Sequence, residues 1–262
     1  MTILVASNEL KLLFSKGHAL GAWSPSNLAH PYDGQNQTAV RNWLVGESVF
    51  PRFTVVSTDG STTTTSRVVN IGSPANGDNS LIVHRTAAAS TITGPAGWSQ
   101  LENVTCQAGD QLYVGTKVCD GTEGATATIT HGSAVRSITQ AFVITGSASP
   151  TYSQYVRDIP LVGSVTPFTD PLLGGIQPGV RRLFMVFSTW DSQGEVISSP
   201  ASPWIDGGTV SNTGAGGAGQ ANITYAYRWI VANAIDGVTF TMPDTIAGGA
   251  NSTNFGMVVS PT

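Results

Sequence analysis

Histidine and acidic side chains are the groups in this sequence that could carry acid–base or metal chemistry. The four histidines are far apart in the sequence, and none lies in a recognisable motif: His18, His30, His84 and His131. His84 and His131 each follow an expected strand, so the two could lie at one end of a β-sandwich. A hydrogen-bonded or solvated histidine is nevertheless the simpler interpretation of each. The acidic residues lie beside glycines or in expected turns, where Asp and Glu are ordinary loop residues.

No pattern for a catalytic or metal site accompanies these residues. The sequence has no HExxH or paired Cys/His spacing for zinc, no DxDxDG loop for calcium and no GxSxG nucleophile elbow. The glycine run GAGGAGQ at 214–220 precedes an expected strand, where a phosphate-binding loop requires a helix. The only cysteines, Cys106 and Cys119, are interpreted as buried thiols too far apart along an extended strand to form a disulfide. The sequence therefore predicts a non-enzymatic protein without a metal or cofactor.

The composition of the chain favours an all-β fold. Of its 262 residues 40% are hydrophobic, but only 11% are charged, against roughly 25% in typical soluble domains. Thr, Val and aromatic runs separated by glycines are typical of sheets. The net charge of −4 is spread without blocks, so we expect no nucleic-acid partner. No apolar run approaches the roughly 18 residues of a membrane span, so we expect no membrane partner either.

Two segments match without a gap at an offset of 113 residues: QLYVGTKVCDGTEGATATI at 111–129 and TYAYRWIVANAIDGVTFTM at 224–242. Both read as a hairpin whose five-residue loop ends in glycine. Because alternate residues of a strand share a face, each copy has one largely apolar face that we expect to point into its own core. These faces are Leu112, Val114, Thr116 and Val118 in the first copy, and Tyr225, Tyr227, Trp229 and Val231 in the second.

Weaker matches flank this repeat in the same order. Ser80-LIV corresponds to Arg182-LFM at offset 102, Trp98 to Trp204 near offset 106, and Ala141-FVI to Gly256-MVV at offset 115. Short strands with turn signals between them are typical of antiparallel sandwiches. We therefore predict two tandem antiparallel β-sandwich domains (Ig-like or jelly-roll-like) that arose by internal duplication, at 49–150 and 151–262. The two tryptophans are expected to fill or cap the cores, the alternative being platforms on which sugars stack.

Residues 1–48 belong to neither copy and form an N-terminal extension. The segment concentrates apolar and aromatic residues among prolines and glycines, and this surface must be buried somewhere. We predict that it anchors the chain to another subunit, the alternative being that it packs on its own first domain. The expected interface residues are Leu12, Leu13, Phe14, Trp23, Tyr32 and Trp43.

The strings GPAGWSQL, GDQLYVGTKVCDGTEGATATI and ITQAFVITG resemble a β-sandwich module of tailed-bacteriophage virion proteins, and RRLFMVF, NITYAYRWIV and GVTFTM resemble a variant of it. Together these strings extend over about 68–259, most of the chain. The resemblance implies a non-enzymatic virion structural protein, assembled in the host cytoplasm and homo-oligomeric in the particle. A capsid decoration (cement or head-fibre) protein bound to the major capsid protein is favoured. The alternative is a tail, neck or tail-fibre component that binds a host-surface glycan or a partner tail protein.

Overall fold

The structure, a computed structural model, describes thirteen stretches of the chain. They are residues 2–6, 9–13, 19–23, 51–60, 63–106, 109–146, 151–160, 165–168, 182–190, 204–212, 221–230, 238–241 and 251–261. Every regular element in these stretches is a β-strand, and every strand pairing is antiparallel. The prediction of an all-β protein is thus confirmed.

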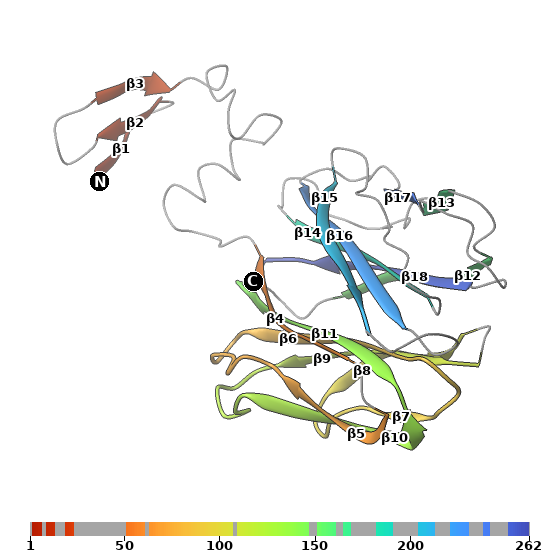
Figure 1. Ribbon diagram of the computed structural model, residues 1–262. Helices are drawn as coiled ribbons and strands as arrows, with labels where there is room; N and C mark the ends of the chain where they lie inside the picture. The colour runs from red at the N-terminus through yellow and green to blue at the C-terminus, as the bar shows by residue number, and fades with distance from the viewer. Residues whose placement is uncertain are drawn as a thin grey trace.

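The first half of the chain, residues 52–145, forms two sheets. The first large sheet has the order β4 (Arg52–Gly60), β11 (Ser137–Thr145), β6 (Asn79–Thr86), β9 (Gln111–Val118) and β8 (Ser99–Thr105). The small sheet has the order β5 (Thr64–Asn70), β10 (Thr126–Val135) and β7 (Ile92–Thr93). Figure 1 shows the small sheet as the bottom layer, with the first large sheet above it.

The second half, residues 151–259, also contains one large sheet and one smaller sheet. The second large sheet has the order β12 (Thr151–Pro160), β18 (Asn251–Val259), β14 (Arg182–Trp190), β16 (Asn222–Ile230) and β15 (Ile205–Ser211). A two-stranded sheet joins β13 (Val165–Phe168) to β17 (Val238–Thr241). Among the described strands, none of one half pairs with a strand of the other half.

The two large sheets share their strand order and part of their register. In each sheet the first strand of the half (β4 or β12) lies beside the last (β11 or β18). Next come an inner strand (β6 or β14) and then two strands that are consecutive in the chain (β9 and β8, or β16 and β15). Leu81 pairs with Thr116 in the first sheet, and Leu183 pairs with Trp229 in the second, which matches the sequence offsets of 102 and 113. A bulge in β4 lies opposite the step from Ala141 to Phe142 of β11. A bulge in β12 lies opposite the step from Gly256 to Met257 of β18, 115 residues further along the chain.

The two large sheets pack face to face around one inner core. This inner core consists of Leu81, Val83, Cys106, Leu112, Val114, Ile138, Phe142, Ile144, Leu183, Met185, Phe187, Ala221, Ile223, Tyr225, Phe255, Met257 and Val259. Phe142 of β11 meets Tyr225 of β16 edge to face, with ring centroids 5.2 Å apart. Aromatic pairs in this arrangement add stability beyond the area they bury.

The structure corrects two expectations about the repeated segments. They are not hairpins, because β9 and β16 lie in the large sheets, whereas β10 and β17, which follow the loops, lie in the small sheets. Leu112 and Val114 do not face a core separate from that of Tyr225, because all three lie in the inner core. Two sheets that each present an apolar face bury more surface by packing on each other than by packing separately. Val118, at the end of β9, is 55% exposed, and Val231 lies outside the described residues.

The opposite face of the first large sheet packs on the small sheet and forms an outer core. This outer core consists of Val69, Ile71, Ile82, Ile92, Tyr113, Ala127, Ile129 and Ala141, with Val56 and Trp98 packed against it. Burial raises the pKa of Tyr113 to about 12. Its ring lies against two glycines, because a Cβ atom on Gly94 or Gly115 would lie 2.1 or 2.2 Å from the Tyr113 hydroxyl oxygen. These two positions therefore require glycine.

Candidate binding groove beside Trp98

The GPAGW segment forms a tight turn that presents Trp98 on the outer core. The backbone N–H of Trp98 donates to the carbonyl of Pro95 over 3.2 Å. Gly97 has a φ of 76°, which suits the third position of a type II turn, where glycine is favoured. Trp98 is half-buried against the outer core, whereas Trp204 is buried. Core packing is thus observed for both tryptophans, and Trp98 also borders a groove.

The DGTEG loop uses its own acidic side chains to fix its backbone. Asp120 accepts hydrogen bonds from the backbone N–H and the hydroxyl of Thr122, over 2.8 and 2.6 Å. Glu123 accepts from the backbone N–H groups of Asp120 and Gly121, over 2.9 and 3.0 Å. It also forms an ion pair with Lys117, whose Nζ lies 3.3 Å from Oε1.

These contacts stabilise the charged form of both carboxylates. The hydrogen bond from the Thr122 side chain, followed by that from its backbone, lowers the pKa of Asp120. The hydrogen bond from the backbone of Asp120 is the main cause that lowers the pKa of Glu123. Carboxylates held in this way are poor general acids at neutral pH. The acidic residues of the DGTEG string therefore have a structural role, since they hold the loop.

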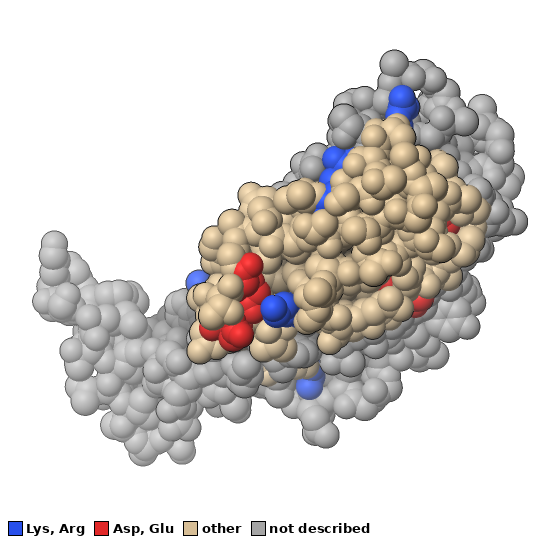
Figure 2. All heavy atoms as spheres, turned by 90° about the horizontal axis from the view of Figure 1, so that it is seen from below, with Lys and Arg blue, Asp and Glu red and all other residues tan. Residues whose placement is uncertain are grey.

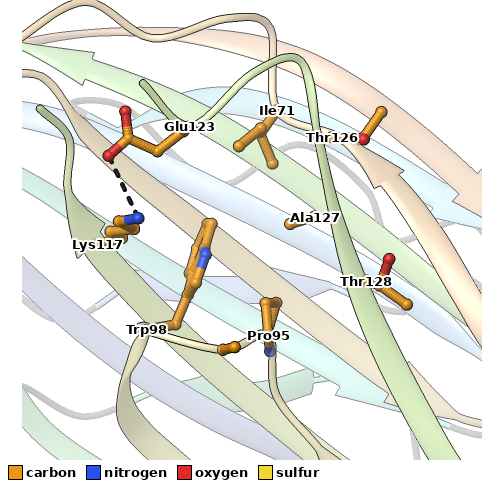
Figure 3. A pocket seen from close by; sticks show the side chains of 9 residues that line it. Ile71, Pro95, Trp98, Lys117, Glu123, Thr126, Ala127 and Thr128 are labelled. Carbon is orange, nitrogen blue, oxygen red and sulfur yellow. Dashed lines mark ion pairs between the residues drawn. The ribbon is translucent and has the colours of Figure 1, made fainter. Parts of the chain in front are cut away.

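The turn and the loop border a groove of about 280 Å³. It is lined by Ile71, Pro95, Ala96, Trp98, Lys117, Glu123, Thr126, Ala127 and Thr128. Figure 3 shows the indole of Trp98 rising toward Ile71 and Ala127, with the Lys117–Glu123 pair at one end. The lining has apolar walls, and its only two charged side chains neutralise each other. Such a groove suits the binding of a neutral, partly apolar group.

A histidine pair lies between the first large sheet and the small sheet. Nε2 of His84 lies 2.9 Å from Nε2 of His131, and the rings stack with centroids 5.1 Å apart. His131 Nδ1 lies 2.9 Å from the carbonyl of Thr64, so this nitrogen is the donor. His131 Nε2 then accepts from His84 Nε2, and His84 Nδ1 accepts from the hydroxyl of Thr139 over 2.7 Å. One proton arrangement satisfies every nitrogen, with both rings neutral.

The same surroundings disfavour protonation of either ring. Desolvation lowers the pKa of His84 well below its usual value, with smaller contributions from His131 and Arg67. Desolvation also lowers the pKa of His131. The structure thus brings together the two histidines that the sequence placed at one end of a sandwich, and both are hydrogen-bonded.

A second buried polar cluster connects the two halves of the chain. Arg85 Nε and Nη2 lie 2.6 and 2.5 Å from Oδ2 of Asp110, and Nη1 donates to the Thr189 hydroxyl over 2.7 Å. The hydroxyl of Thr253 donates to the sulfur of Cys106 over 3.1 Å. Arg85, Asp110 and Cys106 belong to the first half, whereas the two threonines belong to the second. This cluster aligns the large sheets and has no opening to solvent for a substrate, since all five side chains are buried.

The predicted interface residues of the N-terminal extension lie at or beyond the limit of the described structure. The strands β1 (Thr2–Ala6), β2 (Glu9–Leu13) and β3 (Ala19–Trp23) form a three-stranded sheet with that order. Leu12 and Leu13 lie in β2, and Trp23 is the last residue of β3. Phe14, Tyr32 and Trp43 lie outside the described residues.

The described surface carries few charges. Figure 2 shows a face on which most atoms belong to uncharged residues, with the acidic and basic side chains in small groups. Within the described residues, no three His, Cys, Asp or Glu side chains are placed to hold a metal ion together. None of the described elements is a helix of the length and apolar character that a membrane span needs. Cys106 and Cys119 are buried thiols, and the Cys119 sulfur lies 3.3 Å from the Ser80 hydroxyl.

The groove was not among the residues singled out as a site from the sequence. Its signal was present in the GPAGW and DGTEG strings, but the sequence does not reveal that the turn and the loop line the same groove. Comparison with protein families, with curated proteins and with solved structures found no match to this chain.

Proposed function

We propose that the chain is a non-enzymatic structural protein of a tailed-bacteriophage particle, and that it decorates the capsid as a cement or head-fibre protein. The observation that carries this proposal is the role of the DGTEG loop. The loop is part of the sequence pattern that resembles phage virion modules, and its acidic groups are engaged in holding backbone N–H groups. A side chain with such a role builds a module and performs no chemistry.

We further propose that the two halves arose by internal duplication of a β-sandwich module. The shared strand order and the matching registers of the two large sheets support this proposal. In this view two modules meet through their equivalent apolar faces, and the Arg85–Thr189 contact fixes their alignment. A rigid two-module body of this kind suits a protein that works through surface contacts in an assembly.

The proposal is tested by the composition of purified particles that carry this chain. Quantitative mass spectrometry gives its copy number relative to the major capsid protein. A decoration protein is expected at hundreds of copies per particle, in a fixed ratio to the capsid protein. Three, six or twelve copies would instead indicate the neck or tail, and absence from the particle would contradict a virion role.

A tail or tail-fibre role with glycan binding is the second candidate, and the groove beside Trp98 is the observation that favours it. A half-exposed indole can stack on the apolar face of a sugar ring, and a groove of about 280 Å³ could hold a small ring. A glycan array probed with the purified chain tests this candidate. Binding that is lost in Trp98→Ala, but not in Trp204→Phe, would support it.

The anchoring role of residues 1–48 belongs to the same proposal. The expected contacts are those of Leu12, Leu13, Phe14, Trp23, Tyr32 and Trp43 with the major capsid protein or with another copy of the chain. Replacing the four aromatic residues of this set with alanine should lower particle occupancy and leave the unfolding midpoint of the two halves unchanged. Full occupancy of the quadruple variant would contradict the anchoring role.

A further inference from the structure

The groove contains a stretch of sheet edge whose backbone groups have no described strand beside them. In an antiparallel strand, the N–H and C=O of one residue point to one neighbour and those of the next residue point to the other. Ala125 accepts from the N–H of Ile71, which continues the pairing with β5. Gly132 donates to the carbonyl of Thr91, on the side of β7. Odd-numbered residues of β10 therefore point to β5, and even-numbered residues point to the opposite edge.

Strand β7 covers only a short part of that opposite edge. Its two residues pair with Thr130 and His131 of β10, and the chain then leaves the sheet at Gly94. The backbone N–H and C=O groups of Thr126 and Thr128 consequently point away from β5, where no described strand pairs with them. Both residues line the groove, and the Pro95–Trp98 turn lies across from them (Figure 3).

We propose that this groove is a strand-addition site, in which an extended, uncharged segment of a neighbouring virion polypeptide pairs with the edge of β10 at Thr126 and Thr128. The segment would extend the small sheet along the line of β7. It would exchange backbone hydrogen bonds with the two threonines and place an apolar side chain against the indole of Trp98. Main-chain pairing gives such sites their affinity, and the neighbouring side-chain pocket gives them selectivity.

Two features of the groove favour an extended peptide over other occupants. The donors and acceptors that pair with no described strand belong to alternate residues of β10, so they repeat at roughly 6.6 Å, the spacing that a second strand presents. The two charged side chains at the rim are already paired with each other over 3.3 Å, so an uncharged segment fits without leaving an ion unpaired. The inference rests on the assembly role proposed above only for the origin of the peptide, because binding itself can be measured on the isolated chain.

The first test uses the full-length chain and a displayed library of random nine-residue peptides that lack Asp, Glu, Lys and Arg. The selected peptides serve as the probes, and amide hydrogen exchange by NMR is the readout. Without peptide, the amides of Thr126 and Thr128 should exchange at least about tenfold faster than those of Ala127 and Ile129, which pair with β5. With peptide, the first two should slow about tenfold or more and the other two should stay protected.

Substitutions that act on the backbone separate strand addition from contacts through side chains. Proline is tolerated where the missing N–H would face the free edge of a sheet. Thr128→Pro removes one of the two N–H groups that face the groove and spares the pairing with β5. It should weaken peptide binding about tenfold, whereas Thr128→Ala, which keeps the N–H, should change it by less than about twofold. The thermal midpoints of both variants show whether the fold is retained. Two N-methylated forms of a selected peptide supply a readout independent of any variant, one methylated at its odd-numbered residues and the other at its even-numbered residues. Only the form whose methyl groups replace the N–H groups that face β10 should lose binding.

Each outcome decides the proposal. Failure to select any peptide, protection that does not alternate, or equal binding by peptides methylated in either set would overturn it. Loss of glycan binding in Trp98→Ala, without peptide binding, would assign the groove to a sugar instead. In particles, reduced occupancy of Thr128→Pro beside full occupancy of Thr128→Ala would support the proposal. Full particle occupancy of both Thr128 variants would overturn the strand-addition site and leave the virion role unaffected. Absence of the wild-type chain from particles would contradict only the virion role.

Discussion

His84 and Arg85 are neighbours in β6, yet they serve two different interfaces. Successive side chains of a strand point to opposite faces of the sheet, so His84 reaches the small sheet and Arg85 reaches the second large sheet. The outer interface, between the first large sheet and the small sheet, contains the neutral histidine pair. The inner interface, between the two large sheets, contains the Arg85–Asp110 ion pair, whose arginine also donates to Thr189. The difference indicates that acid weakens the outer interface, whereas loss of a single partner weakens the inner one.

The largest effect is expected at the inner interface. Asp110→Asn removes the negative charge opposite Arg85, and leaving a buried charge without its partner costs about 3–5 kcal/mol. We expect the free energy of unfolding, measured in urea, to fall by this amount. The double variant Arg85→Met/Asp110→Leu should recover most of the loss, because an apolar pair of similar volume often replaces a buried ion pair without cost. A double variant as unstable as Asp110→Asn would contradict this explanation.

A smaller loss is expected from the hydrogen bond that joins the halves. Thr189→Val keeps the side-chain volume but removes the hydroxyl that accepts from Arg85 Nη1 over 2.7 Å. Leaving a buried donor unsatisfied costs about 1–3 kcal/mol. In an Arg85→Met background the same substitution should cost much less, since the donor is already gone. Equal costs in both backgrounds, measured as a double-mutant cycle, would show that the hydroxyl stabilises only its own sheet.

The outer interface is expected to be sensitive to pH. Burial depresses the pKa values of His84 and His131 in the folded state, so below about pH 6.5 the unfolded chain binds protons that the folded chain does not. Stability is therefore full above that pH and falls as the pH drops toward the folded pKa values, by up to about 1.4 kcal/mol per pH unit for each ring. The positive charge of Arg67 lowers the pKa values of both rings further.

Urea unfolding at pH 7.5, 6.5 and 5.5 tests this expectation. His84→Gln/His131→Gln removes both titrating groups, so its loss of stability between pH 7.5 and 5.5 should be clearly smaller than that of the wild type. Asp110→Asn is the matched control, because it weakens the inner interface and leaves the histidine pair in place. A double variant with the same pH dependence as the wild type would show that other groups are responsible.

Part of the fold could be predicted from the sequence because it depends on local patterns. Thr/Val alternation indicated strands, and the ungapped match of the two segments anticipated the equivalent positions of β9 and β16 in their sheets. The prediction that each segment is a hairpin was wrong, because the strand after the loop joins the small sheet. What could not be predicted was the pairing of faces. Leu112 and Tyr225 each lie on an apolar face, and periodicity does not say which other face covers it. The contact between Phe142 and Tyr225 depends on which two apolar faces pack together, and the local sequence pattern does not specify this.

The candidate site shows the same limit. The glycines of GPAGW and DGTEG indicated turns, and Gly97 and Gly121 do have positive φ values of 76° and 86°. The edge of β10 became visible only from the pairing partners of alternate residues, since β7 ends after two residues. The sequence did predict that His84 and His131 could lie close together, because each follows an expected strand. In the structure their rings stack and share a hydrogen bond.

The smallest expected effect concerns the loop at the rim of the groove. Glu123→Gln keeps the shape of the side chain but removes its charge, so the ion pair with Lys117 is lost and the bonds from Asp120 and Gly121 weaken. Global stability should change little, because the amide oxygen of the glutamine can still accept from one of the two backbone N–H groups. Amide exchange at Asp120 and Gly121 should become faster, while exchange at Leu112 and Val114 stays the same. Glu102→Gln, a matched change whose carboxylate contacts only the neighbouring N–H of Asn103, should leave the loop amides unaffected. If Glu123→Gln also left them unaffected, the acidic residue of the motif would not hold the loop, and the strongest support for a structural role would be lost.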